Sequence, residues 1–286
     1  MQAKKLRQIL AQDGIICAPG AYDAWSAKLI ADAGFPAVYM TGYGVSASHL
    51  GQPDIGLIGM SEMATAAGNI AYAANIPLIA DADNGYGNTL NVIRTVQAYE
   101  RAGVAAIQLE DQVMPKRCGH MEGKELISES EMVAKIRAAV YAKNCPDTVI
   151  IARTDARAVH GFAEAIQRAQ AYVQAGADVI FFEAPASVEE MREVRRLLSV
   201  PLLANMVENG KTPLLGLKEL EQLGYKIAIF PASLIYSATK AVMSTLSDLK
   251  THGTTKMSLA NMVDFPTFNQ MIGVQQYRDI EKSFMK

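Results

Sequence analysis

The chain has 286 residues, 50% of them hydrophobic and 20% charged, which are ordinary proportions for a globular protein. The 29 acidic and 27 basic side chains give a formal net charge of −2, so no basic excess is present to neutralise a phosphate backbone, and we expect no nucleic-acid partner. No apolar run approaches membrane-spanning length, and three widely spaced cysteines fit neither a disulfide framework nor a closed zinc site, so we predict a cytoplasmic protein without a membrane partner.

Short apolar runs alternate with amphipathic helical stretches along the chain. Four segments share one pattern, a helical stretch that closes at a glycine and is followed at once by an apolar strand: residues 26–42, 95–111, 168–184 and 217–233. The closing residues supply the left-handed conformation that a helix C-terminus favours; they are Gly34, Gly103, Gly176 and Gly224. Four further apolar runs separate these segments, at residues 15–20, 77–83, 148–155 and 201–207.

The apolar runs lack polar alternation, which indicates strands that are buried on both faces, as in a parallel sheet wrapped by helices. Eight such strands with intervening helices in about 250 residues predict an α/β fold, a (β/α)8 TIM-type barrel. A doubly wound open sheet is the alternative, but no G-x-G-x-x-G follows the first strand. We expect the barrel to span residues 1–250 and a helical extension of the same domain to span residues 251–286, as two short helices interrupted near Pro266.

The active site of such a barrel lies at its rim, meaning the C-terminal ends of the strands and the loops that follow them. Polar residues gather at six of these ends. One polar residue at a strand end can be a structural cap, but six strands that deliver polar groups to one rim indicate a site. The rim residues are Tyr39, Thr41, Asp81, Asp83, Glu110, Asp111, Arg153, Asp155, Glu183 and Asn205.

The third and fourth strands end in carboxylates. Asp81 and Asp83 are two residues apart, so both can point to the same face of an extended strand end, and Glu110 ends the next strand. An all-oxygen set of this kind suits a hard cation such as Mg²⁺, with Mn²⁺ as a substitute. The structural alternative is that Asp83 caps the glycine-containing turn at residues 85–87.

A long insertion follows the fourth strand, at residues 112–129, and rim loops of this length tend to be functional. Positive neighbours lower the pKa of a thiol, so we interpret Cys118 as reactive, and we interpret Cys17 and Cys145 as structural. The loop contains the run Lys116-Arg117-Cys118-Gly119-His120.

Two other strand ends offer groups that bind anions. Arg153 presents a guanidinium fork that can hold a carboxylate bidentately, although an ion pair with Asp155 or Glu183 is a compatible alternative. The second strand ends in the run Thr41-Gly42-Tyr43-Gly44, whose glycines free backbone N–H groups to face an anion.

Taken together, these motifs resemble the isocitrate lyase and phosphoenolpyruvate mutase superfamily along nearly the whole chain. The loop at residues 116–120 resembles that of the carbon–carbon lyase branch, because mutase members generally lack its cysteine. The motifs that carry the resemblance stand at residues 41–44, 81–87, 108–112, 116–120, 152–156, 182–184 and 204–206.

The resemblance implies a barrel with bound Mg²⁺, held near Asp81, Asp83 and Glu110. It implies a mobile loop that carries the cysteine, and a final helix exchanged between subunits of a homotetramer, a dimer of helix-swapped dimers. The implied catalytic residues are Tyr39, as base on a substrate hydroxyl, Cys118, as proton donor, and His120 and Arg153. The implied substrate-binding residues are Thr41, Gly42, Tyr43, Lys116, Arg117, Gly119, Arg153, Glu183 and Asn205.

The resemblance also bears on the substrate, a small carboxylic acid. Phe181 stands where isocitrate lyases carry Trp, which leaves room for a methyl group on C2 and favours pyruvate as a product. Residues 205–213 are more similar to 2,3-dimethylmalate lyases than to 2-methylisocitrate lyases. The implied activity is therefore Mg²⁺-dependent cleavage of 2,3-dimethylmalate or 2-methylisocitrate to pyruvate plus propionate or succinate. The alternatives are hydrolysis of oxaloacetate to oxalate and acetate, a carboxyphosphonoenolpyruvate-type phosphonomutase, and a non-catalytic binding protein.

Overall fold

The structure of the protein is a computed structural model, and it describes residues 1–119 and 123–285. The chain divides into two compact units, Met1–Leu234 and Ile235–Lys286. The boundary that we expected at residue 250 falls within helix α11 (Ser233–His252).

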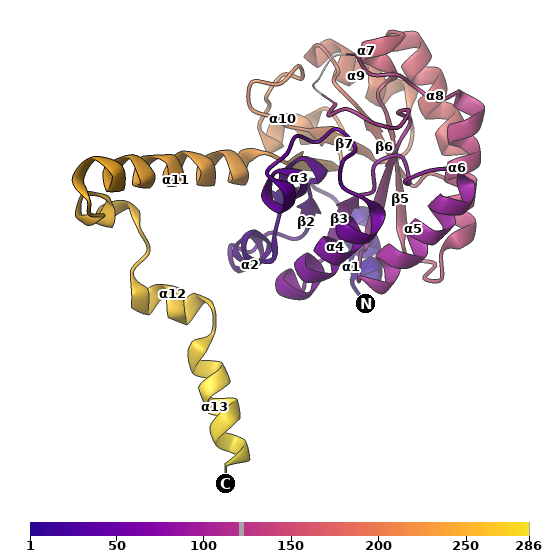
Figure 1. The fold of residues 1–286 in the computed structure, drawn as a ribbon. Coiled ribbons are helices and arrows are strands. Elements are labelled where there is room, and N and C mark those ends of the chain that lie inside the picture. Colours follow the sequence, from indigo (N-terminus) through magenta and orange to yellow (C-terminus); the bar gives the residue numbers. More distant parts are fainter. Residues whose placement is uncertain (120–122, 286) are drawn as a thin grey trace. The chain divides into compact units, whose positions relative to one another are not determined.

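The first unit is a closed barrel of eight parallel strands in chain order, which confirms the predicted TIM-type fold (Figure 1). β1 pairs with β8, with Ile16 opposite Ile227, and this pairing closes the sheet. The strands are β1 (Ile16–Ala21), β2 (Val38–Met40), β3 (Leu78–Asp81), β4 (Ala106–Glu110), β5 (Val149–Thr154), β6 (Val179–Phe182), β7 (Leu202–Asn205) and β8 (Ile227–Phe230).

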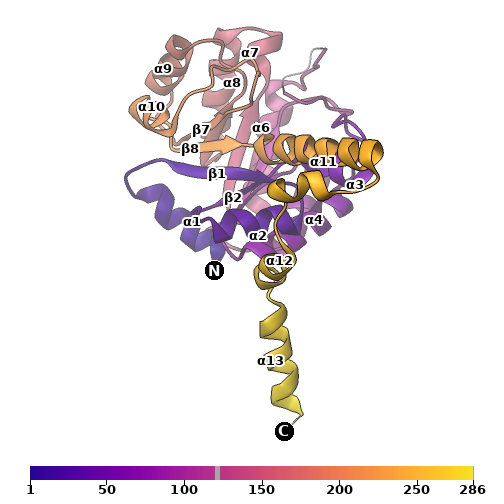
Figure 2. The same cartoon turned by 90° about the vertical axis from the view of Figure 1, so that its left-hand side faces the viewer.

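Helices surround the strands, as Figures 1 and 2 show from two sides. The four glycines expected to close helices have φ angles of 82°, 86°, 108° and 84° at Gly34, Gly103, Gly176 and Gly224, so each is left-handed as predicted. The helices of this unit are α1 (Gln2–Ala11), α2 (Ala24–Asp32), α3 (Gly42–Leu50), α4 (Met60–Ala74), α5 (Thr89–Arg101), α6 (Glu129–Ala142), α7 (Ala156–Val159), α8 (Phe162–Gln174), α9 (Val188–Leu197) and α10 (Leu217–Gln222).

The strands bury both faces, and alternate residues enter two separate apolar clusters. In β3, Leu78 and Ala80 belong to the larger cluster, which also contains helix residues such as Met63 and Val92. Ile79 belongs to the smaller cluster, which fills the barrel interior. Because side chains alternate along a strand, Asp81 lies on the same face as Ile79 and points into the barrel at the rim.

The second unit consists of α11, a 3₁₀ turn (Lys256–Asn261), α12 (Phe265–Met271) and α13 (Val274–Phe284). The 3₁₀ turn ends at Asn261 and α12 begins at Phe265, so the chain is interrupted directly before Pro266, which lies in the first turn of α12. A second break, between α12 and α13, falls at Gly273, whose φ of 78° is left-handed.

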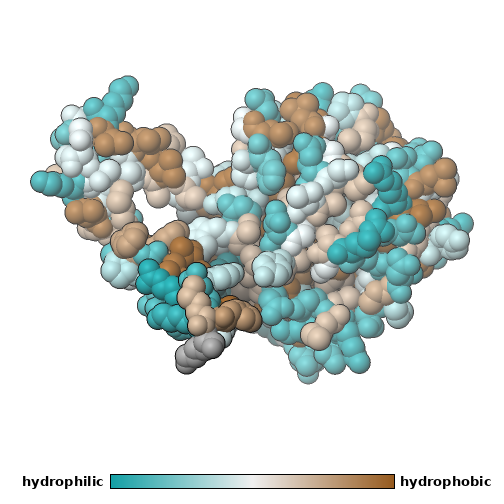
Figure 3. Space-filling view, turned by 60° about the horizontal axis from the view of Figure 1, so that its bottom comes forward, coloured by the Kyte–Doolittle hydropathy of each residue, from teal (hydrophilic) through white to brown (hydrophobic). Residues whose placement is uncertain are grey.

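The helices of the second unit expose apolar side chains (Figure 3). The described residues of α11, α12 and α13 include none that is buried. Phe265 and Phe284, for example, are 80% and 85% exposed. In the part of the chain that the structure describes, no helix is both long and apolar enough to cross a membrane.

Candidate active site

The strand alternation that fills the barrel interior also gathers charge at the rim. Along β5, Val149 and Ile151 lie in the interior cluster, and Arg153 is the next residue on the same face. Five strands show the same change from apolar to polar near their C-terminal ends. The resulting inward-facing rim residues are Asp81, Glu110, Arg153, Glu183 and Asn205, all buried.

A buried hydrogen-bonded chain joins Tyr39 to Asp81 through Gln108, which sequence reasoning did not select. The Tyr39 hydroxyl donates to Oε1 of Gln108 at 2.9 Å, and Nε2 of Gln108 donates to Oδ1 of Asp81 at 3.2 Å. Burial first, and then the nearby charge of Asp81, raise the pKa of Tyr39 well above its ordinary value. Tyr39 is therefore a protonated donor in this arrangement.

The predicted metal carboxylates are crowded and buried. Burial raises the pKa of Asp81 and Glu110, and it raises the pKa of Asp83 to about 7 even though Lys116 opposes the shift. Oδ2 of Asp83 and Oε1 of Glu110 are buried and receive no hydrogen bond from any described residue. Such oxygens are suited to a cation.

The carboxylates suit a Mg²⁺ ion that keeps part of its water shell. Among the residues that the structure describes, no three His, Cys, Asp or Glu side chains converge closely enough to ligate a metal directly. Mg²⁺ usually keeps several waters and takes one or two carboxylates. Asp81, Asp83 and Glu110 therefore fit a hydrated Mg²⁺ rather than a cation enclosed by protein ligands.

Lys116 neutralises part of this carboxylate cluster. Its side chain is buried, with Nζ 2.6 Å from Oδ1 of Asp54 and 2.9 Å from Oδ1 of Asp83. Burial lowers the pKa of Lys116, but Asp83 and Asp54 outweigh this effect and raise it well above its ordinary value. Asp54 follows α3 in a loop without a strand signal, so the sequence contained no local cue for its role.

Arg153 makes the ion pair that we considered as the structural alternative. Its Nε and Nη2 donate to the two carboxylate oxygens of Asp155 at 2.9 and 3.0 Å, and Nε lies 3.4 Å from Oε2 of Glu110. The guanidinium also lies 5.0 Å from the ring centroid of Phe181. These contacts fix the guanidinium at the rim.

Glu183 and Asn205 lie together as predicted, since Nδ2 of Asn205 donates to Oε2 of Glu183 at 3.3 Å. On the second strand end, the Thr41 hydroxyl accepts from the backbone N–H of Gly44 and caps α3. Gly42 is close to the acidic cluster, because a Cβ there would lie 2.6 Å from Oδ2 of Asp81. Tyr43 is half-buried in the first turn of α3.

The cysteine loop is docked on the rim. Gln112 binds both backbone groups of Arg117, accepting from its N–H at 3.0 Å and donating to its carbonyl at 2.8 Å. The Arg117 side chain is exposed and Cys118 is half-buried. Gly119 is buried, and a Cβ there would clash with Nη2 of Arg153 and lie 2.7 Å from Oε1 of Glu183. The loop backbone therefore rests directly on these two rim side chains; His120 lies outside the described residues.

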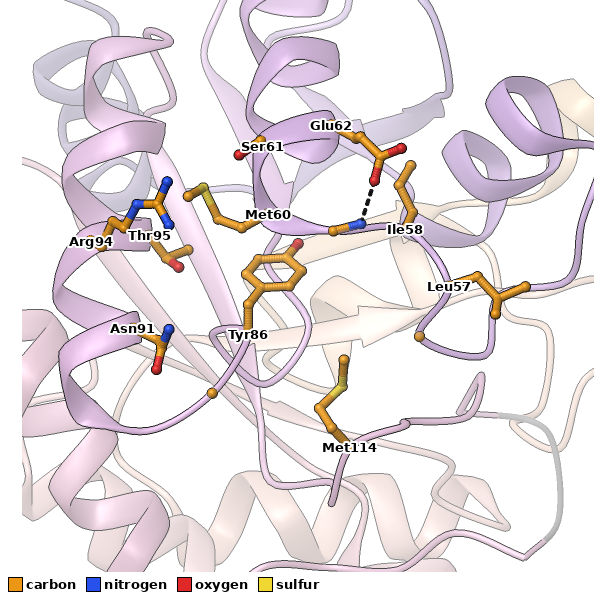
Figure 4. A pocket seen from close by; sticks show the side chains of 13 residues that line it. Leu57, Ile58, Met60, Ser61, Glu62, Tyr86, Asn91, Arg94, Thr95 and Met114 are labelled. Carbon is orange, nitrogen blue, oxygen red and sulfur yellow. Dashed lines mark hydrogen bonds between the residues drawn. The ribbon is translucent and has the colours of Figure 1, made fainter.

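A cavity of about 590 Å³ lies beside the rim cluster (Figure 4). Tyr86 is at its centre, between Met60, Arg94 and Met114. The Tyr86 and Tyr99 hydroxyls are 2.9 Å apart, and Tyr99 donates to the Asp81 carbonyl at 3.0 Å. The predicted site residues that the structure describes do not line this cavity, and the two tyrosine hydroxyls connect its lining residue Tyr86 to the backbone of Asp81.

The family model described as phosphoenolpyruvate phosphomutase matches residues 6–250 of the chain. The chain belongs to this family. The match spans the whole barrel, including each strand end described above, and it confirms the resemblance that the motifs indicated.

Two relatives of the chain illustrate the similarity. A 2,3-dimethylmalate lyase of Eubacterium barkeri is 53% identical over 99% of this chain and 98% of its own length. A 2-methylisocitrate lyase of Aeropyrum pernix is 47% identical over 97% of this chain and 90% of its own length. Relatives that match over nearly their full length are thus named as lyases.

Solved structures agree with this family assignment. An oxaloacetate acetylhydrolase in complex with the inhibitor 3,3-difluorooxalacetate superimposes with a TM-score of 0.94 at 40% identity, covering 99% of this chain and 96% of that one. A phosphonopyruvate hydrolase in complex with oxalate and Mg²⁺ has a TM-score of 0.89 at 30% identity, and all of both chains is covered. Within the family one fold therefore carries several reactions.

Proposed function

We propose that this protein is a Mg²⁺-dependent carbon–carbon lyase that cleaves 2,3-dimethylmalate, or 2-methylisocitrate, to pyruvate and a carboxylic acid. The observation that carries the proposal is the docked loop, which brings the backbone beside Cys118 against Arg153 and Glu183. A thiol held at an arginine-lined rim suits proton delivery to a carboxylate product. The 53% identity to a 2,3-dimethylmalate lyase supports this substrate class.

Cleavage requires that the C2 hydroxyl loses a proton and that the C2–C3 bond breaks. The bonding electrons pass to C3, next to a carboxylate, and a proton must then be added there. We assign this proton to Cys118 as general acid. We assign the hydroxyl proton to Tyr39 acting as a tyrosinate: its own phenol proton must first pass to solvent, which a cation near Asp81 would favour by offsetting the charge that raises the pKa of Tyr39. The products from 2,3-dimethylmalate are pyruvate, formed from C2, and propionate, formed from C3.

Other rim residues hold the charged ends of the substrate. We assign the guanidinium of Arg153 and the amide of Asn205 to the carboxylate oxygens of the substrate, together with backbone N–H groups at residues 41–43. Asp81, Asp83 and Glu110 would hold hydrated Mg²⁺, with Mn²⁺ as a substitute. The chemistry that this cation supplies when bound is Lewis-acid polarisation of the forming 2-oxo group.

We also propose a cytoplasmic homotetramer, a dimer of helix-swapped dimers. The exposed apolar side chains of α11, α12 and α13 support exchange, because surfaces of this kind are covered in stable proteins. Three free cysteines suit a reducing compartment. Light scattering on the full chain should give a mass of four subunits; a monomer mass would contradict the exchange.

The test is a substrate panel. Purified wild type with Mg²⁺ is incubated with 2,3-dimethylmalate, 2-methylisocitrate, isocitrate and oxaloacetate, and the products are identified by mass. We expect pyruvate from a methylated acid and loss of activity in EDTA. The second candidate is oxaloacetate hydrolysis, which the 40% identical acetylhydrolase structure favours, and oxalate plus acetate as the only products would select it. A phosphonomutase would leave all four acids intact.

A further inference from the structure

Lys124 is a buried lysine in the cysteine loop, outside the motif that marks the loop. Its side chain is 2% exposed. Nζ donates to the carbonyl of Gly119 at 2.6 Å and to Oδ1 of Asp155 at 2.7 Å. One ammonium group therefore joins the residue after Cys118 to the end of β5.

Asp155, the carboxylate that accepts from Lys124, is itself held in place. The Asp155 backbone N–H donates to Oδ1 of Asp111 at 2.9 Å, and both Asp155 oxygens accept from Arg153. Burial raises the pKa of Asp155, but the charges of Arg153 and Lys124 outweigh it and hold the pKa well below its ordinary value. A single carboxylate thus receives the guanidinium of the rim and the ammonium of the loop.

Charge compensation alone does not explain this arrangement. The guanidinium of Arg153 already binds Asp155 through two donors. The second bond of Lys124 goes to an uncharged carbonyl, at a point where the loop has no room for a side chain at Gly119. A lysine with these two acceptors connects two parts of the site.

We propose that Lys124 is a positioning residue that docks the Cys118 loop on the same carboxylate that orients Arg153. The loop and the guanidinium then contact the same carboxylate, Asp155. This contact fixes the Cys118 thiol and the Arg153 guanidinium relative to each other. The catalytic consequence rests on the proposed lyase function. The docking of the loop does not depend on that function, and it can be measured without substrate.

The experiment compares the wild type with Lys124→Met, which keeps the length of the side chain and removes the ammonium. Lys124→Arg is the conservative variant, and Lys4→Met on α1, at an exposed position, is the control for loss of one positive charge. Each protein is labelled with iodoacetamide under native conditions. Mass spectrometry of the peptides gives the rate at Cys118, with the half-buried Cys145 as internal reference.

We expect Lys124→Met to raise the labelling rate of Cys118 relative to Cys145 by about tenfold, and kcat to fall by about tenfold while KM changes less. Lys124→Arg should recover most of both values, and Lys4→Met should match the wild type. If a folded Lys124→Met protein labels at the wild-type rate, the proposal is wrong, whatever happens to kcat.

The reference thiol distinguishes unfolding of the variant from release of the loop alone, because unfolding would also raise the labelling rate of Cys145. In that event Lys124→Gln, a shorter side chain that keeps one donor but cannot reach both acceptors, replaces it and should show the same selective increase at Cys118. A wild type that releases pyruvate from none of the acids would contradict the lyase function and leave the labelling result valid.

Discussion

The lower interior and the rim of the barrel are built by the same strands and have opposite chemistry. The lower interior is packed with apolar side chains such as Ile16, Val149 and Ile227, all buried. At the rim the same inward-facing positions hold Asp81 and Arg153. A strand therefore supplies stability near its start and reactive groups near its end.

This difference has an energetic consequence. Apolar burial in the lower interior stabilises the fold. At the rim, burial raises the pKa of Asp81, Asp83 and Glu110, which means that the folded protein holds these carboxylates at a cost. We expect variants of the lower interior to lose stability and keep chemistry, and variants of the rim to do the reverse.

The largest effect should follow Cys118→Ser in the docked loop. Loss of the proton donor should lower kcat by about 1,000-fold, because a positioned general acid contributes a factor of this order. The midpoint of thermal unfolding and the affinity for oxalate with Mg²⁺ should stay near the wild-type values. Cys145→Ser is the matched control and should retain full activity. Loss of oxalate binding together with turnover would make the loop a structural clamp and not a proton donor.

In the lower interior, Ile227→Ala should reverse this pattern. Ile227 is fully buried in the barrel interior, so truncation leaves a cavity and should lower the free energy of unfolding by about 3 kcal/mol. Urea unfolding measures the loss, and steady-state assays of the folded enzyme should give kcat within about twofold of the wild type. A large fall in kcat without a loss of stability would show that the two regions are not separable.

Substitution of Asp83 tests how much a buried charge at the rim lowers the free energy of unfolding of the metal-free protein. Its pKa is raised from 3.8 to about 7 by burial, so the folded state keeps a proton that the unfolded chain has released. Stability in EDTA should therefore fall as the pH rises through this interval, and Asp83→Asn should lessen the fall by about 2 kcal/mol. Urea unfolding at pH 5 and pH 8 gives both values. Equal losses of stability between pH 5 and pH 8 in the two proteins would mean that ionisation of Asp83 does not destabilise the folded state.

Gln108 lies between the two regions and should give the smallest effect. Gln108→Leu breaks the bonds to Tyr39 and Asp81 without a change in position of the strand. We expect kcat to fall by about tenfold and stability to change by about 1 kcal/mol. Gln108→Glu, which still accepts from Tyr39, should retain more activity than Gln108→Leu. Wild-type kcat in Gln108→Leu would remove the Tyr39–Gln108–Asp81 chain from the mechanism.

The barrel could be predicted because its signals are local. Each short apolar run marks a strand, and a glycine such as Gly103 marks the helix end before it. The rim carboxylates followed from the same pattern, since Asp81 and Glu110 end their strands. In the second unit Pro266 indicated a break, and α12 begins directly beside it, whereas the break at Gly273 was not predicted.

The residues that sequence reasoning missed act through distant partners. Asp54 pairs with Lys116 from a loop, and Lys124 reaches Asp155 across 31 positions. Gln108 reads as an ordinary strand residue until the barrel closes and brings Tyr39 and Asp81 beside it. Partners of this kind are set by tertiary packing, for which one sequence has no local signal.

The most direct test of the account is ¹H NMR of the products formed in D₂O by wild type with Mg²⁺ and 2,3-dimethylmalate. We expect pyruvate and propionate in equal amounts, with one deuterium at C2 of propionate, because the exchanged thiol of Cys118 delivers it to the carbon that leaves. Intact 2,3-dimethylmalate in this sample, together with parallel samples in which 2-methylisocitrate stays intact and oxaloacetate is converted to oxalate and acetate, would contradict the lyase assignment.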